Sequence, residues 1–205
     1  MGFEHFAASF GLAAPMPAAN IDTDVIMPKQ FLKGIDRAGL DAGLFYGLRF
    51  AENGAPNPDF ILNKTAWRDT RFLVVGPNFG CGSSREHAVW GLRQFGIRAL
   101  IGTTFAGIFF DNCARNGLLA IEASSSDVAL LMAAATDPKR NHFCVDLVNQ
   151  TITTEDSVIR YQIDESRKTA LMRGLDAIGV TLEGREAIAL FEDMHFAQNP
   201  WLRPS

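Results

Sequence analysis

The chain has 205 residues, a length that fits one domain over residues 1–205 with some elaboration. Apolar residues make up 47% of it and charged residues 20%, as in ordinary soluble globular proteins, and no apolar run reaches the ~18 residues that a membrane helix needs. The net charge of −4 argues against a nucleic-acid binder with a broad basic surface, although a local basic patch stays compatible with it.

The three cysteines, Cys81, Cys113 and Cys144, are an odd number and are widely spaced. They predict no disulfide framework, and they lack the C-x-x-C spacing of most zinc and iron–sulfur sites. We therefore expect no metal or cofactor to be bound by this chain. The N-terminus lacks a basic segment followed by a long apolar stretch, so we expect no secretory signal and a cytoplasmic location.

The first 70 residues carry few regular patterns. Residues 1–28 are short apolar pieces broken by three prolines and show little helical periodicity. Residues 29–70 are irregular, and segment 53–58 predicts a loop because it is built largely from asparagine, glycine and proline. An irregular stretch of this length favours a functional role or a partner contact over an idle linker.

A regular alternation of strands and helices begins near residue 71. Apolar runs predict strands at 72–75, 98–103 and 118–121. The segments between them predict helices that end at Gly96 and Gly117. This order and spacing predict right-handed parallel crossovers and hence a parallel βαβαβ core.

The remaining residues predict further elements around this core. We expect a helix over 127–135, a hairpin near residue 150 and another strand over 157–163. Helical periodicity returns in 164–175 and 183–195. The expected fold class is therefore α/β, a parallel core with an added β layer.

A glycine-rich loop, NFGCGSSREH at residues 78–87, joins the first of these strands to the first helix. A helix N-terminus offers unpaired N–H groups and a partial positive charge, so anions bind there readily. Gly80 and Gly82 let the backbone close around a ligand, and Arg85 is suited to bidentate binding of a carboxylate. The loop therefore suits a small carboxylated or phosphorylated substrate. It has neither the lysine of a P-loop nor the G-x-G-x-x-G spacing of a dinucleotide-binding loop.

The same residues also fit a purely structural interpretation. Ser83 and Glu86 match the S-x-x-E capping box, in which the serine caps the helix. His87, one turn into the helix, is typical of a hydrogen-bonded structural histidine, and Cys81 of a small packing residue. A capping hydroxyl still has a proton to donate, so both roles of Ser83 stay open.

Segment 80–96, GCGSSREHAVWGLRQFG, resembles the signature of the aconitase superfamily swivelling domain. Segments 20–32, 57–60 and 174–182 are similar to the family of bacterial 3-isopropylmalate dehydratase small subunits. The resemblance spans nearly the whole chain, and it implies an aconitase-type swivelling β/β/α domain.

The resemblance also implies a reaction and a partner. Such enzymes are hydro-lyases that interconvert 2-isopropylmalate and 3-isopropylmalate in leucine biosynthesis, by removing water and adding it back at the other carbon. Their large subunit carries a [4Fe–4S] cluster on three cysteines, whose open iron acts as a Lewis acid on the leaving hydroxyl. The expected partners are this large subunit, in a heterodimer or higher assembly, and the small-molecule substrate, with no nucleic acid and no membrane.

By motif position, the resemblance assigns the serine base of the superfamily to Ser83. Ser84 and Arg85 would bind a substrate carboxylate, and Asp24 would support the site, although an Asx-turn carboxylate is an alternative for Asp24. A serine hydroxyl is a weak acid, so the helix N-terminus, backbone N–H groups and Arg85 would have to stabilise its alkoxide. Further supporting positions are Gly80, Gly82 and His87.

The chain departs from its relatives after segment 20–28. Aconitase-like relatives carry a further carboxylate-binding arginine there, and here that position is Lys33 or Arg37. Phe31 and Leu32 offer apolar contact to an isopropyl group, with core packing as the alternative. Other functions stay open: a related hydro-lyase acting on citraconate, 2-methylmalate or homoaconitate, or a non-catalytic carboxylate- or RNA-binding relative.

Overall fold

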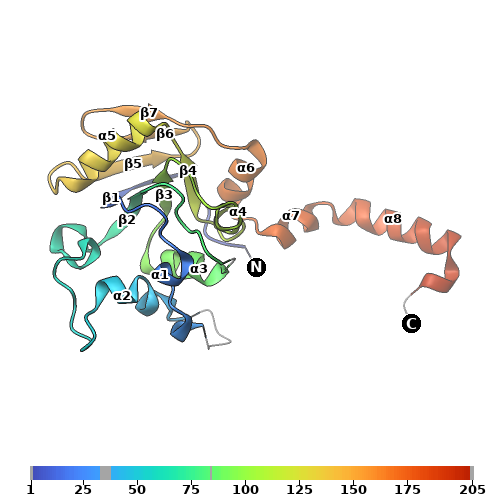
Figure 1. Cartoon of the computed structure of the whole chain (residues 1–205). Helices are drawn as coiled ribbons and strands as arrows, with labels where there is room; N and C mark the ends of the chain where they lie inside the picture. The colour runs from blue at the N-terminus through green and yellow to red at the C-terminus, as the bar shows by residue number, and fades with distance from the viewer. Residues whose placement is uncertain (1, 33–37, 84, 204–205) are drawn as a thin grey trace.

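The computed structural model describes residues 2–32, 38–83 and 85–203 (Figure 1). It contains a mixed sheet of seven strands in the order β4-β3-β2-β1-β5-β6-β7. β1 to β4 run parallel, whereas β5 pairs antiparallel with β1 and continues into β6 and β7. The strands are β1 (Ala8–Met16), β2 (Thr70–Val75), β3 (Ala99–Gly102), β4 (Leu119–Glu122), β5 (His142–Asp146), β6 (Thr151–Thr153) and β7 (Val158–Arg160).

Helices lie on both faces of this sheet (Figure 1). α3 and α4 connect the parallel strands on one face, while α5 carries the chain from β4 across the other face to β5. The helices are α1 (Thr23–Ile26), α2 (Tyr46–Arg49), α3 (Glu86–Phe95), α4 (Gly107–Arg115), α5 (Ser125–Thr136), α6 (Glu165–Arg173), α7 (Ala177–Glu183) and α8 (Arg185–Gln198). Among the described helices, none is long and apolar enough to cross a lipid bilayer.

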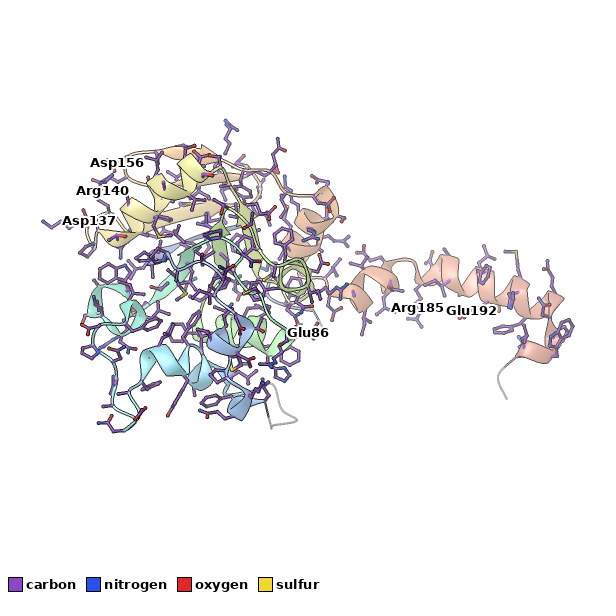
Figure 2. The ribbon with its side chains drawn as sticks, viewed as in Figure 1. Glu86, Asp137, Arg140, Asp156, Arg185 and Glu192 are labelled. Carbon is purple, nitrogen blue, oxygen red and sulfur yellow. The ribbon has the colours of Figure 1, made fainter. Side chains whose placement is uncertain are left out.

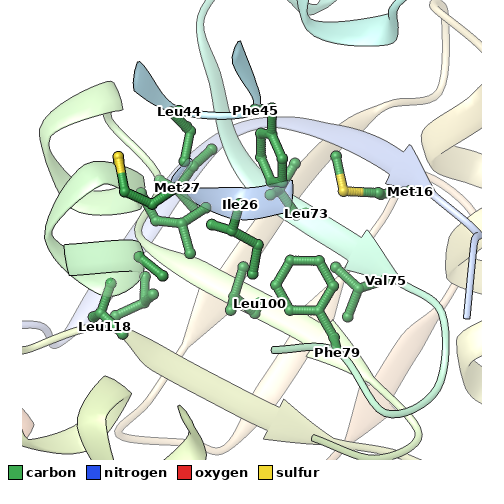
Figure 3. Packing of buried hydrophobic residues seen from close by; sticks show 14 of the residues in the cluster. Met16, Ile26, Met27, Leu44, Phe45, Leu73, Val75, Phe79, Leu100 and Leu118 are labelled. Atoms are coloured by element: carbon green, nitrogen blue, oxygen red, sulfur yellow. The ribbon is translucent and has the colours of Figure 1, made fainter. Parts of the chain in front are cut away.

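Alternate residues of β2 supply two separate cores, because successive side chains of a strand point to opposite faces of the sheet. Leu73 and Val75 join the core that includes α1, α3 and α4, which Figure 3 shows from close by. Phe72 and Val74 join the core under α5 and the antiparallel strands. All four side chains are fully buried, and each such burial contributes about 1.5–3 kcal/mol.

β1, the central strand of the sheet, was not expected, because three prolines interrupt the first 28 residues. Pro15 nevertheless lies within β1, opposite Val74 of β2. The Ala13 N–H points toward the β5 side and donates to the Asn141 carbonyl at 2.7 Å. Position 15 faces the β5 side as well, because alternate residues of a strand direct their N–H groups to the same neighbour. The pairing with β5 ends at Leu12, so no β5 carbonyl lies opposite position 15 and the N–H that proline lacks is not needed there.

Most other expected elements are confirmed within a few residues. The three parallel strands and their helices are present, and Gly96 and Gly117 follow the helix ends with the positive φ expected of C-terminal glycines. The added β strands continue the same sheet beyond β1. Segment 53–58 is a loop, as expected. The described residues of segment 29–69 form short helical turns joined by irregular chain, and α7 was not expected.

Candidate active site

The loop that follows β2 lies against a segment that follows β1. We call residues 76–83 the serine loop and residues 20–24 the facing segment. Three backbone hydrogen bonds of 2.8 to 2.9 Å join them: Asn20 to Pro77, Gly80 to Ile21, and Thr23 to Cys81. Because β1 and β2 are parallel, both segments leave the sheet at the carboxyl ends of the strands, which is where open α/β sheets bind ligands.

The serine loop is anchored in the core by an aromatic side chain. Phe79 is fully buried, and its ring lies edge-on to that of Phe109 with centroids 5.6 Å apart. Gly80 has φ +79°, and a Cβ at this position would lie 2.2 Å from the Phe109 ring. Gly82 has φ +94° and faces the Asp22 carboxylate. Both glycines are therefore required by backbone conformation or close approach.

Ser83 is held by a threonine 60 positions earlier in the chain. The Thr23 hydroxyl donates to the Ser83 carbonyl at 3.1 Å and accepts from the Ser83 N–H at 3.2 Å. The two hydroxyl oxygens are also 3.2 Å apart, within hydrogen-bonding distance. Thr23 is fully buried, whereas Ser83 is exposed. A buried group thus fixes the position of an accessible hydroxyl.

Arg85 and Asp24 form an ion pair beside Ser83, in which Nη1 of the arginine donates to Oδ1 of the aspartate. The Arg85 side chain is mostly buried, with 19% exposed, and that of Asp24 is 43% exposed. The hydrogen bond from Arg85 holds the pKa of the Asp24 carboxyl below its usual value. A guanidinium has five N–H donors, so a pair through one of them leaves others able to bind a second carboxylate.

Two structural interpretations of these residues are wrong. α3 begins at Glu86 with Arg85 at the N-cap and no side-chain capping bond, so Ser83 does not form a capping box. The left-handed turn at Gly82 and the bonds to Thr23 direct the serine toward the facing segment instead. The Asx-type cap of α1 is made by Asp22, which accepts from the Asp24 N–H, and not by Asp24.

Of the other expected site residues, some pack against neighbouring side chains and some lie outside the described residues. His87 is half-buried, and its ring lies 4.7 Å from that of Trp90. Phe31 and Leu32 are half-buried and pack against the core, with the Phe31 ring 5.0 Å from Tyr46. Ser84, Lys33 and Arg37 lie outside the described residues.

Sequence reasoning missed Thr23 and Asp22, which position the serine and the facing segment. They lie in a short stretch without periodicity, and their partners are distant in sequence. The glycines that bend the serine loop toward them were the one available signal.

Of the three cysteines, Cys81 belongs to the serine loop, whereas Cys113 lies on α4 and Cys144 on β5. Cys113 is fully buried on α4, and burial raises the pKa of its thiol, so it remains protonated and acts as a packing residue. Cys81 and Cys144 are half-buried. Within the part of the chain that the structure describes, no three cysteine, histidine or acidic side chains gather as a metal site. The donor set of this chain therefore does not fit an iron–sulfur cluster.

The site is accessible to solvent: Ser83 is exposed, and the Asp24 side chain is 43% exposed. Two cavities of about 280 and 350 Å³ lie beside Arg93, and their linings do not include Ser83, Arg85 or Asp24. The arrangement provides a positioned hydroxyl next to a guanidinium that can bind a carboxylate. Such a site can bind an acid and transfer a proton once another surface covers it.

Comparison with known proteins gives consistent matches. Residues 3–126 match the family model described as the aconitase C-terminal domain. A Mannheimia succiniciproducens protein named 3-isopropylmalate dehydratase small subunit 1 is 58% identical over 93% of this chain and 95% of its own length. A Rhizobium johnstonii protein named 3-isopropylmalate dehydratase small subunit is 49% identical over 199 residues, which cover 97% of this chain and 98% of that protein.

A solved structure shares the fold. The crystal structure of a 3-isopropylmalate dehydratase protein from Methanocaldococcus jannaschii superposes with a TM-score of 0.65 and 25% sequence identity. The match covers 90% of this chain and 99% of that one. The mixed sheet and its helices are therefore an arrangement already seen in a crystal.

Proposed function

Because this chain belongs to the aconitase C-terminal domain family, we infer that it is the small subunit of a 3-isopropylmalate dehydratase, a hydro-lyase. The observation that carries this conclusion is the 58% identity to a small subunit over 93% of the chain. The reaction interconverts 2-isopropylmalate and 3-isopropylmalate in leucine biosynthesis. Water leaves one carbon to give an alkene and returns at the neighbouring carbon.

We propose that Ser83 is the catalytic base. Its alkoxide takes the proton from the carbon next to the one that loses hydroxide, and the C–H electron pair forms the double bond. A serine alkoxide at neutral pH needs strong stabilisation. The Thr23 hydroxyl, 3.2 Å from the Ser83 hydroxyl, can rotate to donate to the alkoxide, and the Arg85 guanidinium adds a positive charge nearby.

The neighbouring residues bind and orient the substrate in this proposal. Arg85, with Ser84, holds one substrate carboxylate, and Asp24 fixes the guanidinium in place through their ion pair. Lys33 or Arg37 holds the second carboxylate. Gly80, Gly82 and His87 support the loop and the start of α3.

Specificity for the isopropyl group is assigned to two apolar side chains. The exposed parts of Phe31 and Leu32 contact the isopropyl methyls, while their other faces pack on the core. One methylene in such a pocket discriminates by only ~1–3 kcal/mol, so small malate homologues remain competing substrates.

The proposed partner is the large subunit, which covers the open site and holds the [4Fe–4S] cluster. The widely spaced cysteines of this chain and the burial of Cys113 support placing the cluster in the partner. We place the assembly in the cytoplasm, where thiols stay reduced.

Reconstitution tests this function. The purified chain alone should be colourless and inactive, and activity should appear when it is mixed with a cluster-bearing large subunit. Hydration activity of the isolated chain would contradict the subunit assignment. Measured on the complex, kcat/KM should be higher for isopropylmalate than for 2-methylmalate or homoaconitate. A higher value for another of these substrates would change the substrate assignment but leave the protein assigned as a hydro-lyase.

A further inference from the structure

The last two helices project away from the rest of the molecule (Figure 1). We call α7, α8 and the helical turn after them the C-terminal arm (residues 177–202). Figure 2 shows Arg185 and Glu192 on this arm, beyond the body of the domain. Among the described residues of α7 and α8, none is buried. The arm is therefore helical although its helices bury no described side chain; its contact with the domain is at α7, where Glu183 pairs with Arg173 of α6.

The base of the arm is firmly attached. The Phe3 N–H donates to the Gly174 carbonyl at 3.0 Å, and the Leu175 N–H to the Ala170 carbonyl at 2.9 Å. Asp176 then caps α7 by accepting from the Gly179 N–H at 2.7 Å. The domain thus sets the direction in which the arm leaves it.

α8 carries an apolar stripe. Ala187, Leu190, Phe191 and Met194 follow the i, i+3, i+4, i+7 spacing of one helix face. Leu190 and Phe191 are each 62% exposed and Met194 is 53% exposed. Trp201, just past α8, is 76% exposed. This stripe has the pattern of an amphipathic helix that lies in a groove of another protein.

Charged residues occupy the other side of α8. At 100° per residue, Glu186, Glu192 and Asp193 fall away from the stripe. The half-buried Phe196 falls on that side too, so the charged side is mixed, whereas the stripe itself carries no charged residue. A 14-residue helix is marginal on its own in water, and its stability comes from packing of the apolar face. Soluble proteins rarely leave such a face uncovered, except where another protein binds.

The apolar surface of the arm is large enough for a stable interface. An aromatic side chain can bury roughly 150–250 Å², and a stable interface needs about 800 Å² from each partner. Phe191 and Trp201 would supply a substantial part of that area. Ile178, Val180, Leu182 and Leu202, each about half exposed or more, are further exposed apolar side chains of the arm.

We propose that the C-terminal arm docks its apolar stripe into a groove of the large subunit. This proposal rests on the proposed function. The similarity to the small subunit from Rhizobium johnstonii runs over 199 of the 205 residues, so it includes most of the arm. The arm is thus shared with another small subunit, and the partner that small subunits have in common is the large subunit. The arm would tether the two chains while the serine loop meets the substrate.

Two alanines on α8 give a matched test. Ala187 lies in the stripe, and Ala189 lies on the charged side; both are exposed, so glutamate at either position leaves the fold intact. Dissociation constants for the large subunit should rise at least tenfold for Ala187→Glu and stay within twofold for Ala189→Glu. Phe191→Asp should raise the dissociation constant about a hundredfold, with an unchanged circular dichroism spectrum of the isolated chain.

Other outcomes separate this proposal from the function on which it rests. If the wild-type complex is active and both alanine variants bind as tightly as wild type, the arm proposal is overturned and the function stands. If Ala187→Glu abolishes self-association of the isolated chain and leaves large-subunit binding unchanged, the occupant of the stripe is a second copy, which also overturns it. If the wild-type chain reconstitutes no activity and does not bind the large subunit, both proposals fail.

Discussion

The serine loop and the C-terminal arm are opposite in how the chain supports them. The loop is joined to the facing segment by backbone bonds, its Phe79 is fully buried, and a buried threonine holds its serine. The arm, in contrast, is helical, and its large apolar side chains are exposed. The loop is held by contacts within this chain, whereas the apolar stripe of the arm has no such contacts among the described residues.

This difference shows how the two chains divide the work. The isolated small subunit already holds its proposed base and carboxylate-binding arginine in position, so their alignment does not depend on the partner. What it lacks is enclosure of the site and a surface for the arm. Substitutions in the loop should therefore change chemistry or folding, and substitutions in the arm should change assembly.

The largest effect is expected at the proposed base. Ser83→Ala should lower kcat of the complex by about a thousandfold, in the range of lost general-base catalysis, because the alkoxide is removed. Binding to the large subunit should be unchanged, since the exposed serine does not support the core. Steady-state kinetics would contradict the assignment if the variant kept more than a tenth of its kcat.

Gly80→Ala tests how rigid the serine loop is. The added methyl would meet the Phe109 ring at 2.2 Å with φ at +79°, so we expect a loss of about 2–4 kcal/mol in the free energy of unfolding. Gly54 has the same φ and open space around it, so Gly54→Ala is a control for backbone strain alone. We expect this variant to lose about 1 kcal/mol in the free energy of unfolding. Urea unfolding curves that coincide for the two variants would show that the contact with Phe109 is unimportant.

Thr23→Val asks whether the buried hydroxyl positions the base. The side chain keeps its shape but loses its hydrogen bonds to Ser83, so kcat should fall about tenfold, the equivalent of one ordinary hydrogen bond, with little change in KM. Thr23→Ser keeps the hydroxyl and should restore most of the rate. Equal rates for the valine and serine variants would remove Thr23 from the mechanism.

The ion pair of Asp24 with Arg85 predicts a pH-dependent contribution to stability. The pKa of Asp24 is lowered in the folded state, so the pair stabilises the fold above the ordinary carboxyl pKa, and this contribution is lost as the pH falls through the lowered pKa. Asp24 is 43% exposed, and solvent screening limits the effect to about 1 kcal/mol or less at neutral pH. The free energy of unfolding, measured from pH 7 to pH 2, should become equal for Asp24→Asn and wild type at the acid end. A difference between the two that stays constant with pH would contradict this assignment.

The smallest effect is expected in the arm. Ala187→Glu should change the unfolding free energy of the isolated chain by less than about 0.5 kcal/mol, because its side chain is exposed on a helix without buried residues. Leu171→Ala on α6, where the side chain is 2% exposed, is the contrasting control and should cost about 2–5 kcal/mol. A similar loss for both variants would mean that the arm packs on the domain.

The sequence predicted the parallel core well, because local signals specify it. Apolar runs mark β2, β3 and β4. Gly96 and Gly117 mark the helix ends, because glycine readily adopts the positive φ that both residues have in the structure. β1 was missed because Pro15 counts against a strand, and only its place past the end of β5 makes it acceptable. That place depends on β5, which begins at His142, far along the chain from Pro15, and no local pattern reveals it.

The sequence singled out residues of the candidate site but not the contacts between them. Ser83, Arg85 and Asp24 were all singled out, but the local motif suggested a helix cap, whereas the serine bonds across 60 residues to Thr23. Long-range contacts of this kind override the S-x-x-E pattern. In the same way, periodicity predicted α8 but carried no information about whether its apolar face would meet the domain.

A mixing experiment tests the central claim that the active site is shared between two chains and that this one supplies the base. Wild-type and Ser83→Ala chains are combined at a constant saturating total with limiting large subunit, and the dehydration rate is measured as their ratio changes. We expect the rate to fall linearly, to about half at equal amounts, because the variant occupies the large subunit without turning over. A rate that stays constant as the variant replaces wild type would contradict it.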